Sequence, residues 1–347
     1  MGIQPNVESM TGDSLDGSES GGGHFRTVFW NDSERRPRMP VRILAGLVLW
    51  FVVGVTLSAI LSTLVTGPSP IFRLRTTYLG NVSVRAIDIV VGSTSTPIAV
   101  YIAARFVDRR WFRDLGLRVD RQWWVDLGAG FVLGGALMTG IFLVELALGW
   151  VSITRYFVVG GVPQWTFPFW FALSVLAYVA GSVVEELLHR GFLLTNFAEG
   201  FQVGPVGSTG AVAIGIALTS GVFAAAHATA LNATVVSTAS IALAGVFLAL
   251  GYVMTGELAF PIGVHIAWNF FEGNLYGFPI SGSTTTSIVG IEQGGPDLFT
   301  GGAFGPEAGV LGVAAIAVGI CATAGWAHHS RGSVGVYPSI LTPDLRR

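Results

Sequence analysis

Long apolar segments recur along this chain and restrict the folds open to it. An α-helix needs about 20 apolar residues to cross the hydrocarbon core of a bilayer. Eight segments of the 347-residue chain have about this length. They cover residues 41–66, 86–106, 125–149, 167–190, 207–229, 234–254, 258–278 and 308–327. We therefore predict an all-α fold, a polytopic integral membrane bundle of about eight transmembrane helices.

The composition supports this prediction and gives no indication of a nucleic-acid partner. Hydrophobic residues make up 51% of the chain and charged residues only 12%, whereas soluble domains carry about 25% charged residues. The net charge of −2 gives no reason to expect a nucleic-acid partner, so the expected surroundings are the lipid bilayer. The single cysteine, Cys321, excludes an intrachain disulfide and a cysteine-based zinc site.

The arginine distribution predicts the orientation in the membrane. Arginines precede the first apolar segment, cluster in 107–121 and recur in the C-terminal tail, whereas 279–307 contains acidic residues and no arginine. Because cytoplasmic loops carry an excess of basic residues, we predict a multi-pass protein of the cell membrane with both termini cytoplasmic. Three arginines of the first outer connection, Arg73, Arg75 and Arg85, run against this rule.

The same patterns divide the chain into five parts. Residues 1–40 are polar and rich in Gly, Ser and Asp, which predicts a disordered tail. Two N-terminal transmembrane helices are expected in 41–106 and a membrane core in 107–278. An outer loop in 279–307 and a last transmembrane helix with a short tail in 308–347 complete the layout.

Two adjacent glutamates, Glu185 and Glu186, follow an apolar run, 167–184, that contains no charged residue. A charge near the bilayer centre costs about 2.5–3.5 kcal/mol on insertion scales, so these carboxylates need a partner or a function. Residues four apart share a helix face, which pairs Glu186 with Arg190. Successive residues differ by about 100° in direction, so Glu185 is predicted to face a cavity as a base that takes a proton from water.

Histidine and asparagine occur in two later apolar segments. His227 ends one of them, and His265 shares a helix face with Asn269 four residues on. An asparagine amide or a histidine can stabilise an oxyanion. We predict that His227 holds the water against Glu185 or binds a metal.

The depths of these residues pose a geometric problem. Glu185 and His227 lie near the C-terminal ends of consecutive helices, which would place them at opposite membrane faces. One site therefore requires the fourth helix to continue past Glu185. A helix over 167–198 would be about 48 Å long, more than the ~30 Å core, so tilt or a bend near Gly191 is predicted.

Each motif also has a purely structural explanation. A Glu–Arg pair can join two helices, a lone histidine is more often packed and hydrogen-bonded, and a His–Asn pair can connect helices by hydrogen bonds. Their joint occurrence favours chemistry over these explanations. Two other glutamates, Glu145 and Glu272, fall near the ends of apolar segments and are expected at the membrane interface.

Taken in order, three motifs resemble those of the CPBP family: Glu185-Glu186-x-x-x-Arg190, Phe223-x-x-x-His227 and His265-x-x-x-Asn269. That family comprises CAAX prenyl endopeptidases, bacteriocin-processing enzymes and Abi proteins. The resemblance covers roughly residues 110–278, including Leu115-Gly116-Leu117-Arg118. It implies that 107–278 is the catalytic core of an intramembrane protease that cuts a membrane-associated protein or peptide.

The resemblance also implies roles for individual residues. Glu185 would be the water-activating base, together with His227, and His265 and Asn269 would form the oxyanion hole. The supporting residues would be Glu186, Arg190, Phe223 and His189. One departure is His189, since the family usually has Phe or another aromatic residue there.

The sequence leaves alternatives open for the cofactor and for the class of function. Glu185, His227 and His265 could bind one Zn²⁺ with a fourth position for water, but a metal-free glutamate mechanism has also been argued for the family. The three residues come from separate helices, without a short-spaced pair such as H-E-x-x-H. Besides a protease, the motifs allow a catalytically idle membrane chaperone or immunity-type binding protein, or a proton-coupled transporter.

Overall fold

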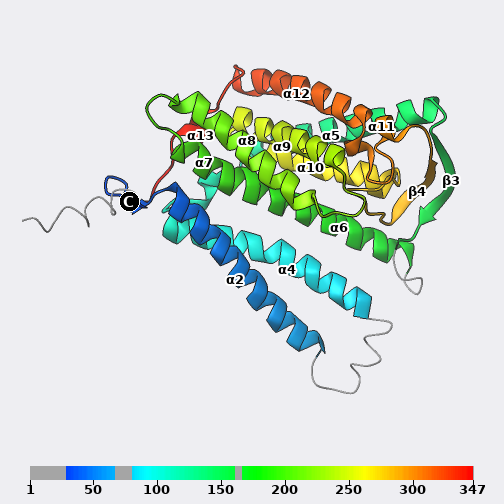
Figure 1. The fold of residues 1–347 in the computed structure, drawn as a ribbon, viewed down its shortest axis with the longest axis horizontal. Coiled ribbons are helices and arrows are strands. Elements are labelled where there is room, and N and C mark those ends of the chain that lie inside the picture. The colour runs from blue at the N-terminus through cyan, green and yellow to red at the C-terminus, as the bar shows by residue number, and fades with distance from the viewer. Residues whose placement is uncertain (1–28, 67–79, 161–165, 347) are drawn as a thin grey trace, which may run out of the picture.

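The computed structural model describes residues 29–66, 80–160 and 166–346, and most of them form helices that lie side by side (Figure 1). Seven helices among the described residues are long and apolar enough to cross a membrane. The predicted all-α membrane bundle is therefore confirmed. The seven are α2 (Met39–Thr66), α4 (Gly80–Ile102), α5 (Arg121–Ala147), the continuous helix of α6 (Phe167–Glu186), η4 (Leu187–Leu194) and α7 (Thr195–Gly200), α8 (Gly207–His227), α9 (Val235–Thr255) and α12 (Val310–Arg331).

The remaining predicted segment, 258–278, forms a shorter helix. α10 (Ala259–Asn269) has 11 residues and runs directly into η5 (Phe270–Leu275), a π-helical stretch of 6 residues. Seven of the residues of α10 are buried, as expected for a helix that is apolar on nearly all sides. Figure 1 shows α10 in the middle of the bundle, beside α5 and α9.

Glycines let the backbones of α5 and α10 approach closely. A Cβ atom on Gly130 would lie 2.2 Å from the carbonyl oxygen of Phe260, and one on Gly263 would lie 2.2 Å from that of Leu127. Small residues at helix contacts serve this purpose in membrane proteins, where packing replaces the hydrophobic effect as the driving force. The contact fixes α10, and with it His265, against α5.

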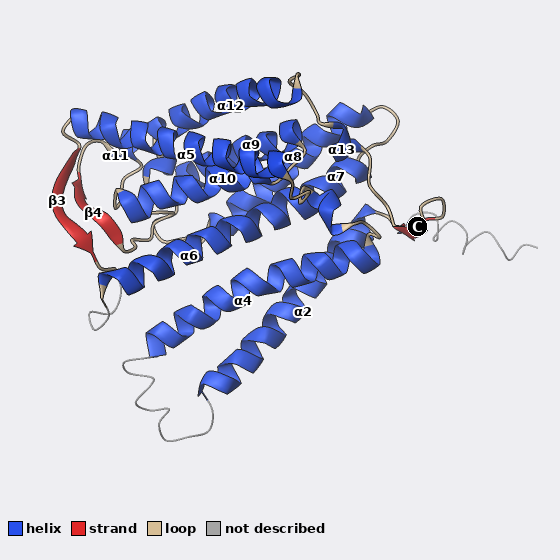
Figure 2. Cartoon of the chain, turned by 180° about the vertical axis from the view of Figure 1, so that it is seen from behind, coloured by secondary structure: helices blue, strands red, loops and turns tan. Residues whose placement is uncertain are grey.

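The two N-terminal helices form a pair of their own. α2 and α4 pack on each other and diverge from the other helices away from α7 (Figures 1 and 2). After α4 the chain continues through the π-helical η2 (Ala103–Val107) and the short η3 (Phe112–Leu115) into α5.

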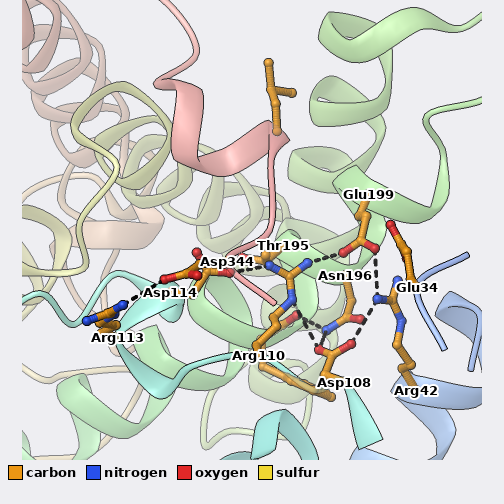
Figure 3. A network of polar contacts seen from close by, with 12 residues as sticks. Glu34, Arg42, Asp108, Arg110, Arg113, Asp114, Thr195, Asn196, Glu199 and Asp344 are labelled. Carbon is orange, nitrogen blue, oxygen red and sulfur yellow. Dashed lines mark hydrogen bonds and ion pairs between the residues drawn. The ribbon is translucent and has the colours of Figure 1, made fainter. Parts of the chain in front are cut away.

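A buried ion network joins this pair to the rest of the bundle (Figure 3). Arg42 Nη1 of α2 lies 2.9 Å from Asp108 Oδ1 and 2.9 Å from Glu199 Oε1 of α7. Arg110 also forms an ion pair with Glu199, and Asn196 Nδ2 donates to Asp108 Oδ2 over 2.9 Å. Opposite charges therefore compensate one another where isolated buried charges would be costly.

Residues 29–40, which the sequence assigns to the polar tail, have secondary structure. They contain β1 (Trp30–Asn31) and β2 (Arg36–Pro37), which pair antiparallel. Arg36 is fully buried and forms an ion pair with Glu199 of α7. The composition of the tail could not predict this contact, because Glu199 lies far along the chain. Residues 1–28 and 67–79, the latter with Arg73 and Arg75, lie outside the described residues.

The connection predicted as an outer loop has secondary structure. It contains β4 (Ser287–Gln293), α11 (Asp297–Thr300) and η6 (Pro306–Ala308). β4 pairs antiparallel with β3 (Val151–Val158), which joins α5 to α6. Figure 1 places this two-stranded sheet at the opposite end of the bundle from α13 (Pro338–Leu341) and the C-terminus.

Candidate active site

One cavity of about 360 Å³ brings the predicted catalytic residues together. Glu185 of α6, His227 of α8, and His265 and Asn269 of α10 all line it. Much of the remaining wall is apolar or aromatic and includes Tyr178, Ile241, Phe247, Leu248 and Trp268. Polar side chains from three helices thus share one space inside a bundle of apolar helices.

The continuation of α6 removes the conflict of depth. The helix does not end at Glu186 but runs on through η4 and α7 to Gly200, as predicted. Glu185 therefore lies in the middle of a 34-residue helix, while His227 is the last residue of α8. The π-helical η4 begins directly after Glu186, and π-helical turns inside α-helices frequently mark functional sites.

The two adjacent glutamates have different environments. Glu186 is fully buried, and its Oε1 accepts a hydrogen bond from Arg190 Nη1 over 2.8 Å. Arg190 also donates from Nη2 to the carbonyl oxygen of Gly245, 3.1 Å away. The Glu185 side chain is 36% exposed and lines the cavity. The predicted pairing of Glu186 with Arg190 is therefore present, and Glu185, which is not part of that pair, is accessible from the cavity.

His265 joins α10 to the glutamate pair. Its Nδ1 lies 2.9 Å from Glu186 Oε1. Because the carboxylate of Glu186 already accepts from Arg190, it acts as the acceptor here too, and His265 Nδ1–H donates. The other ring nitrogen, Nε2, lies 3.8 Å from Glu185 Oε2. One histidine thus contacts the buried glutamate and faces the cavity glutamate.

The tautomer of His227 follows from its hydrogen bond. Its Nδ1 lies 2.8 Å from the carbonyl oxygen of Phe223, which can only accept, so Nδ1–H donates. In the neutral ring Nε2 is therefore an acceptor. Since His227 lines the cavity, this acceptor nitrogen is suited to hold a water molecule.

Phe223 is the common neighbour of the charged and ring side chains. Its ring centroid lies 4.7 Å from that of His227, 5.2 Å from that of His189 and 6.2 Å from that of His265. The guanidinium carbon of Arg190 lies 4.7 Å from the same ring, a cation–π contact. Phe223 therefore separates the Arg190 charge from His227 while packing on both.

His189 fills an aromatic position. It is 5% exposed, its ring meets Phe223 edge to face, and its Nδ1–H donates to the carbonyl oxygen of Glu185 over 2.8 Å. The imidazole packs as an aromatic ring would, which agrees with the aromatic residue usual at this position in the CPBP family.

Two lining residues beside Asn269 could not be singled out from the sequence. Asn269 Nδ2 lies 3.5 Å from Ser182 Oγ, at the limit of a hydrogen bond, so the amide is only loosely held. Ser182 is one of many small residues in the apolar helices, and nothing in its local sequence marks it. Trp268 lines the cavity as well, but its sequence context does not distinguish it from other apolar residues.

The side chains are not arranged as a zinc site. No group of three or more His, Cys, Asp or Glu residues in the described part of the chain is placed to hold a metal ion. Glu185 and His265 approach each other to 3.8 Å between Oε2 and Nε2, but His227 does not complete a ligand set with them. Since zinc requires three or four ligands at about 2.0–2.3 Å, the possible metal set of the sequence does not fit this geometry.

Glu145 and Glu272, which the sequence places near the ends of apolar segments, are covered by other parts of the chain. Both are fully buried. Glu145 accepts a hydrogen bond from Gln293 Nε2 over 2.9 Å, and Glu272 lines the cavity together with Glu307. The cause is the connection 279–307, whose strand and short helices cover the ends of α5 and η5.

One family model matches part of the chain. The family model of the Rce1-like proteins, type II CAAX prenyl endopeptidases, matches residues 163–271. The matched stretch contains Glu185, His227, His265 and Asn269, and it confirms the resemblance to the CPBP family over this part of the chain. Neither the curated proteins nor the solved structures contain a match to the chain.

Proposed function

We propose, starting from the match of its core to the Rce1-like family, that this multi-pass membrane protein is a CAAX-type intramembrane endopeptidase. Its substrate is a membrane-associated protein or peptide. The observation that carries the proposal is the cavity shared by Glu185, His227, His265 and Asn269. Each of these side chains is too polar to face lipid, and together they offer a base, a water ligand and oxyanion donors.

Glu185 acts as the general base. A water molecule in the cavity lies between its carboxylate and Nε2 of His227, which accepts a second hydrogen bond from the water. Glu185 takes one proton of the water while the oxygen attacks the carbonyl carbon of the scissile peptide bond. General-base catalysis of this kind typically contributes about 10²–10⁴-fold to the rate.

Asn269 and His265 stabilise the charge that forms on the carbonyl oxygen. Asn269 supplies an amide N–H. His265 supplies a second donor at Nε2 in its protonated form, because Glu186 holds Nδ1–H and stabilises the resulting positive charge. The role of Glu186 resembles that of the carboxylate that orients the histidine of a hydrolase triad.

The tetrahedral intermediate then collapses with cleavage of the carbon–nitrogen bond. Glu185 returns the proton to the departing amine, so protons balance over the cycle and the carboxylate is regenerated. Arg190 takes no part in these proton transfers. It neutralises Glu186 and, through it, holds His265 in position.

A comparison of protein termini in membrane fractions tests the proposal. We expect strains with the wild-type chain to produce a set of new N-termini that Glu185→Gln strains lack, because only the wild type has the base. Glu292→Gln, which changes an exposed carboxylate of β4, is the matched control and should reproduce the wild-type termini. Identical termini in all three strains would indicate a membrane binding protein without protease activity.

A further inference from the structure

Two glutamates of the cavity have no role in the proposed chemistry. Glu272 of η5 and Glu307 of η6 both line it, and the two residues are only 0% and 4% exposed. They lie 35 residues apart in the chain and are brought together by the fold of the connection 279–307. Buried carboxylates are costly unless they are paired or bind a cation.

The described residues leave this pair largely without donors. Within the described part of the chain, no hydrogen bond is accepted by either oxygen of Glu272 or by Oε2 of Glu307. Oε1 of Glu307 accepts two, from the backbone N–H of Ser281 over 2.7 Å and from its hydroxyl over 3.2 Å. The polar neighbours of Glu272 are the carboxyl of Glu307 and the indole N–H of Trp268, which approaches without a well-aligned hydrogen bond. The connection 279–307 contains no Arg, Lys or His to supply a positive charge.

Three oxygen atoms converge over Gly305. A Cβ atom placed on this glycine would lie 2.3 Å from the carbonyl oxygen of Pro279, 2.6 Å from Glu307 Oε2 and 3.2 Å from Glu272 Oε1. Gly305 has a φ of +128°, a conformation that L side chains rarely adopt. Because residue 305 has no side chain, these three oxygens, which all carry lone pairs, can gather in one small region.

Carboxylate oxygens gathered in this way need a proton or a cation between them. A shared proton would remove one of the two negative charges and leave the other buried, whereas a divalent cation neutralises both. The ligand set is oxygen only, with carboxylates and a backbone carbonyl, which favours Ca²⁺ over zinc, and Ca²⁺ accepts irregular geometry at 2.3–2.6 Å.

We propose that Glu272, Glu307 and the Pro279 carbonyl form a calcium-binding site, with water from the cavity completing the coordination shell. The ion would hold η5, which directly follows Asn269 in the chain, against η6 at the start of α12. The site is independent of Glu185 and His227, so it does not depend on the proposed protease activity.

Calcium binding to the full-length protein in detergent tests the proposal. After treatment with a chelator, the protein is dialysed against CaCl₂ up to about 10 mM, above the dissociation constants of about 10⁻⁴–10⁻³ M of weak extracellular calcium sites. We expect about one Ca²⁺ per chain and an unfolding temperature that rises with calcium concentration. Glu272→Gln and Glu307→Gln should each abolish both effects.

Two control variants separate this site from other carboxylates. Glu145→Gln alters another fully buried glutamate and should bind calcium as the wild type does. Glu185→Gln should lose cleavage but keep calcium binding, so the failure of either proposal is recognised separately. The proposal is overturned if the wild type binds no calcium, as a shared proton would predict, or if Glu272→Gln and Glu307→Gln bind it undiminished.

Discussion

At the scale of single residues, Glu185 and Glu186 show that two identical side chains next to each other on a helix can have different environments. The direction of each could be predicted from helix geometry and from Arg190 four residues on. The hydrogen bond between Glu186 and His265 could not, because it joins residues 79 positions apart. Local spacing predicts contacts within one helix, whereas contacts between helices depend on how the helices pack.

Arg190→Ala tests the structural role of the buried ion pair. Glu186 would remain buried without its positive partner, and breaking such a pair typically costs about 3–5 kcal/mol. We expect a lower unfolding temperature and less folded protein, with partial recovery in the Arg190→Ala/Glu186→Gln double variant, whose glutamine carries no charge. Thermal unfolding in detergent measures the stability of the single and the double variant. A stable, fully folded Arg190→Ala protein without activity would assign Arg190 to the chemistry instead.

Asn269→Ala tests the oxyanion hole. Loss of one such donor typically lowers turnover by about 10²–10³-fold, so weak cleavage should remain, whereas His227→Ala should be nearly inactive. Ser182→Ala is the companion variant, because Ser182 contacts the Asn269 amide only at 3.5 Å and should matter much less. The measurement is the turnover of a cleaved substrate by each variant. Equal losses in Asn269→Ala and Ser182→Ala would contradict the role of Asn269 in the oxyanion hole.

At the scale of elements, the apolar pattern predicted the helices better than their contacts. The segment 258–278 is long and apolar enough to be predicted as one span, whereas the structure divides it between the 11-residue α10 and the π-helical η5. The β3–β4 pairing was missed because the two strands lie far apart in the chain. Continuity of α6 past Glu186 was predicted correctly, since one site required it.

The close contact of α5 and α10 predicts that a methyl group added at Gly130 destabilises the protein. Gly130→Ala would place Cβ against the carbonyl oxygen of Phe260, and overpacking typically costs about 1–3 kcal/mol. The helices should separate and shift His265, lowering both the unfolding temperature and the cleavage rate. Gly128→Ala, two residues earlier on α5, has nothing within 4 Å of the new Cβ and should keep both. Equal behaviour of the two variants would refute the importance of this contact.

At the scale of the whole molecule, the buried ion network and the connection 279–307 lie at opposite ends of the bundle. The ion network with Arg42 and Arg110 lies beside α7, whereas the arginine-free connection 279–307 includes β4 at the opposite end (Figure 1). The sequence predicted this separation from arginine positions alone. It did not predict that the connection covers Glu272 and closes one side of the cavity, because that depends on the path of the chain in space.

Cysteine labelling tests the predicted orientation. Glu292 is exposed on β4, so Glu292→Cys in a Cys321→Ser background provides one accessible thiol in the connection 279–307. An impermeant maleimide added to intact cells should label it, because the arginine distribution predicts this end to face outside. The Cys321→Ser protein without the new cysteine is the control. Labelling only after the cells are opened would reverse the orientation.

The central claim is that Glu185 activates the attacking water. The most direct measurement is the rate at which purified protein cleaves a substrate found by the comparison of termini, for wild type and Glu185→Gln, together with the unfolding temperature of each. Glu185 lines the cavity and is not part of the buried Glu186–Arg190 pair. We therefore predict a rate lower by at least about 10²-fold at an unchanged unfolding temperature, whereas a Glu185→Gln protein that cleaves at the wild-type rate would contradict the account.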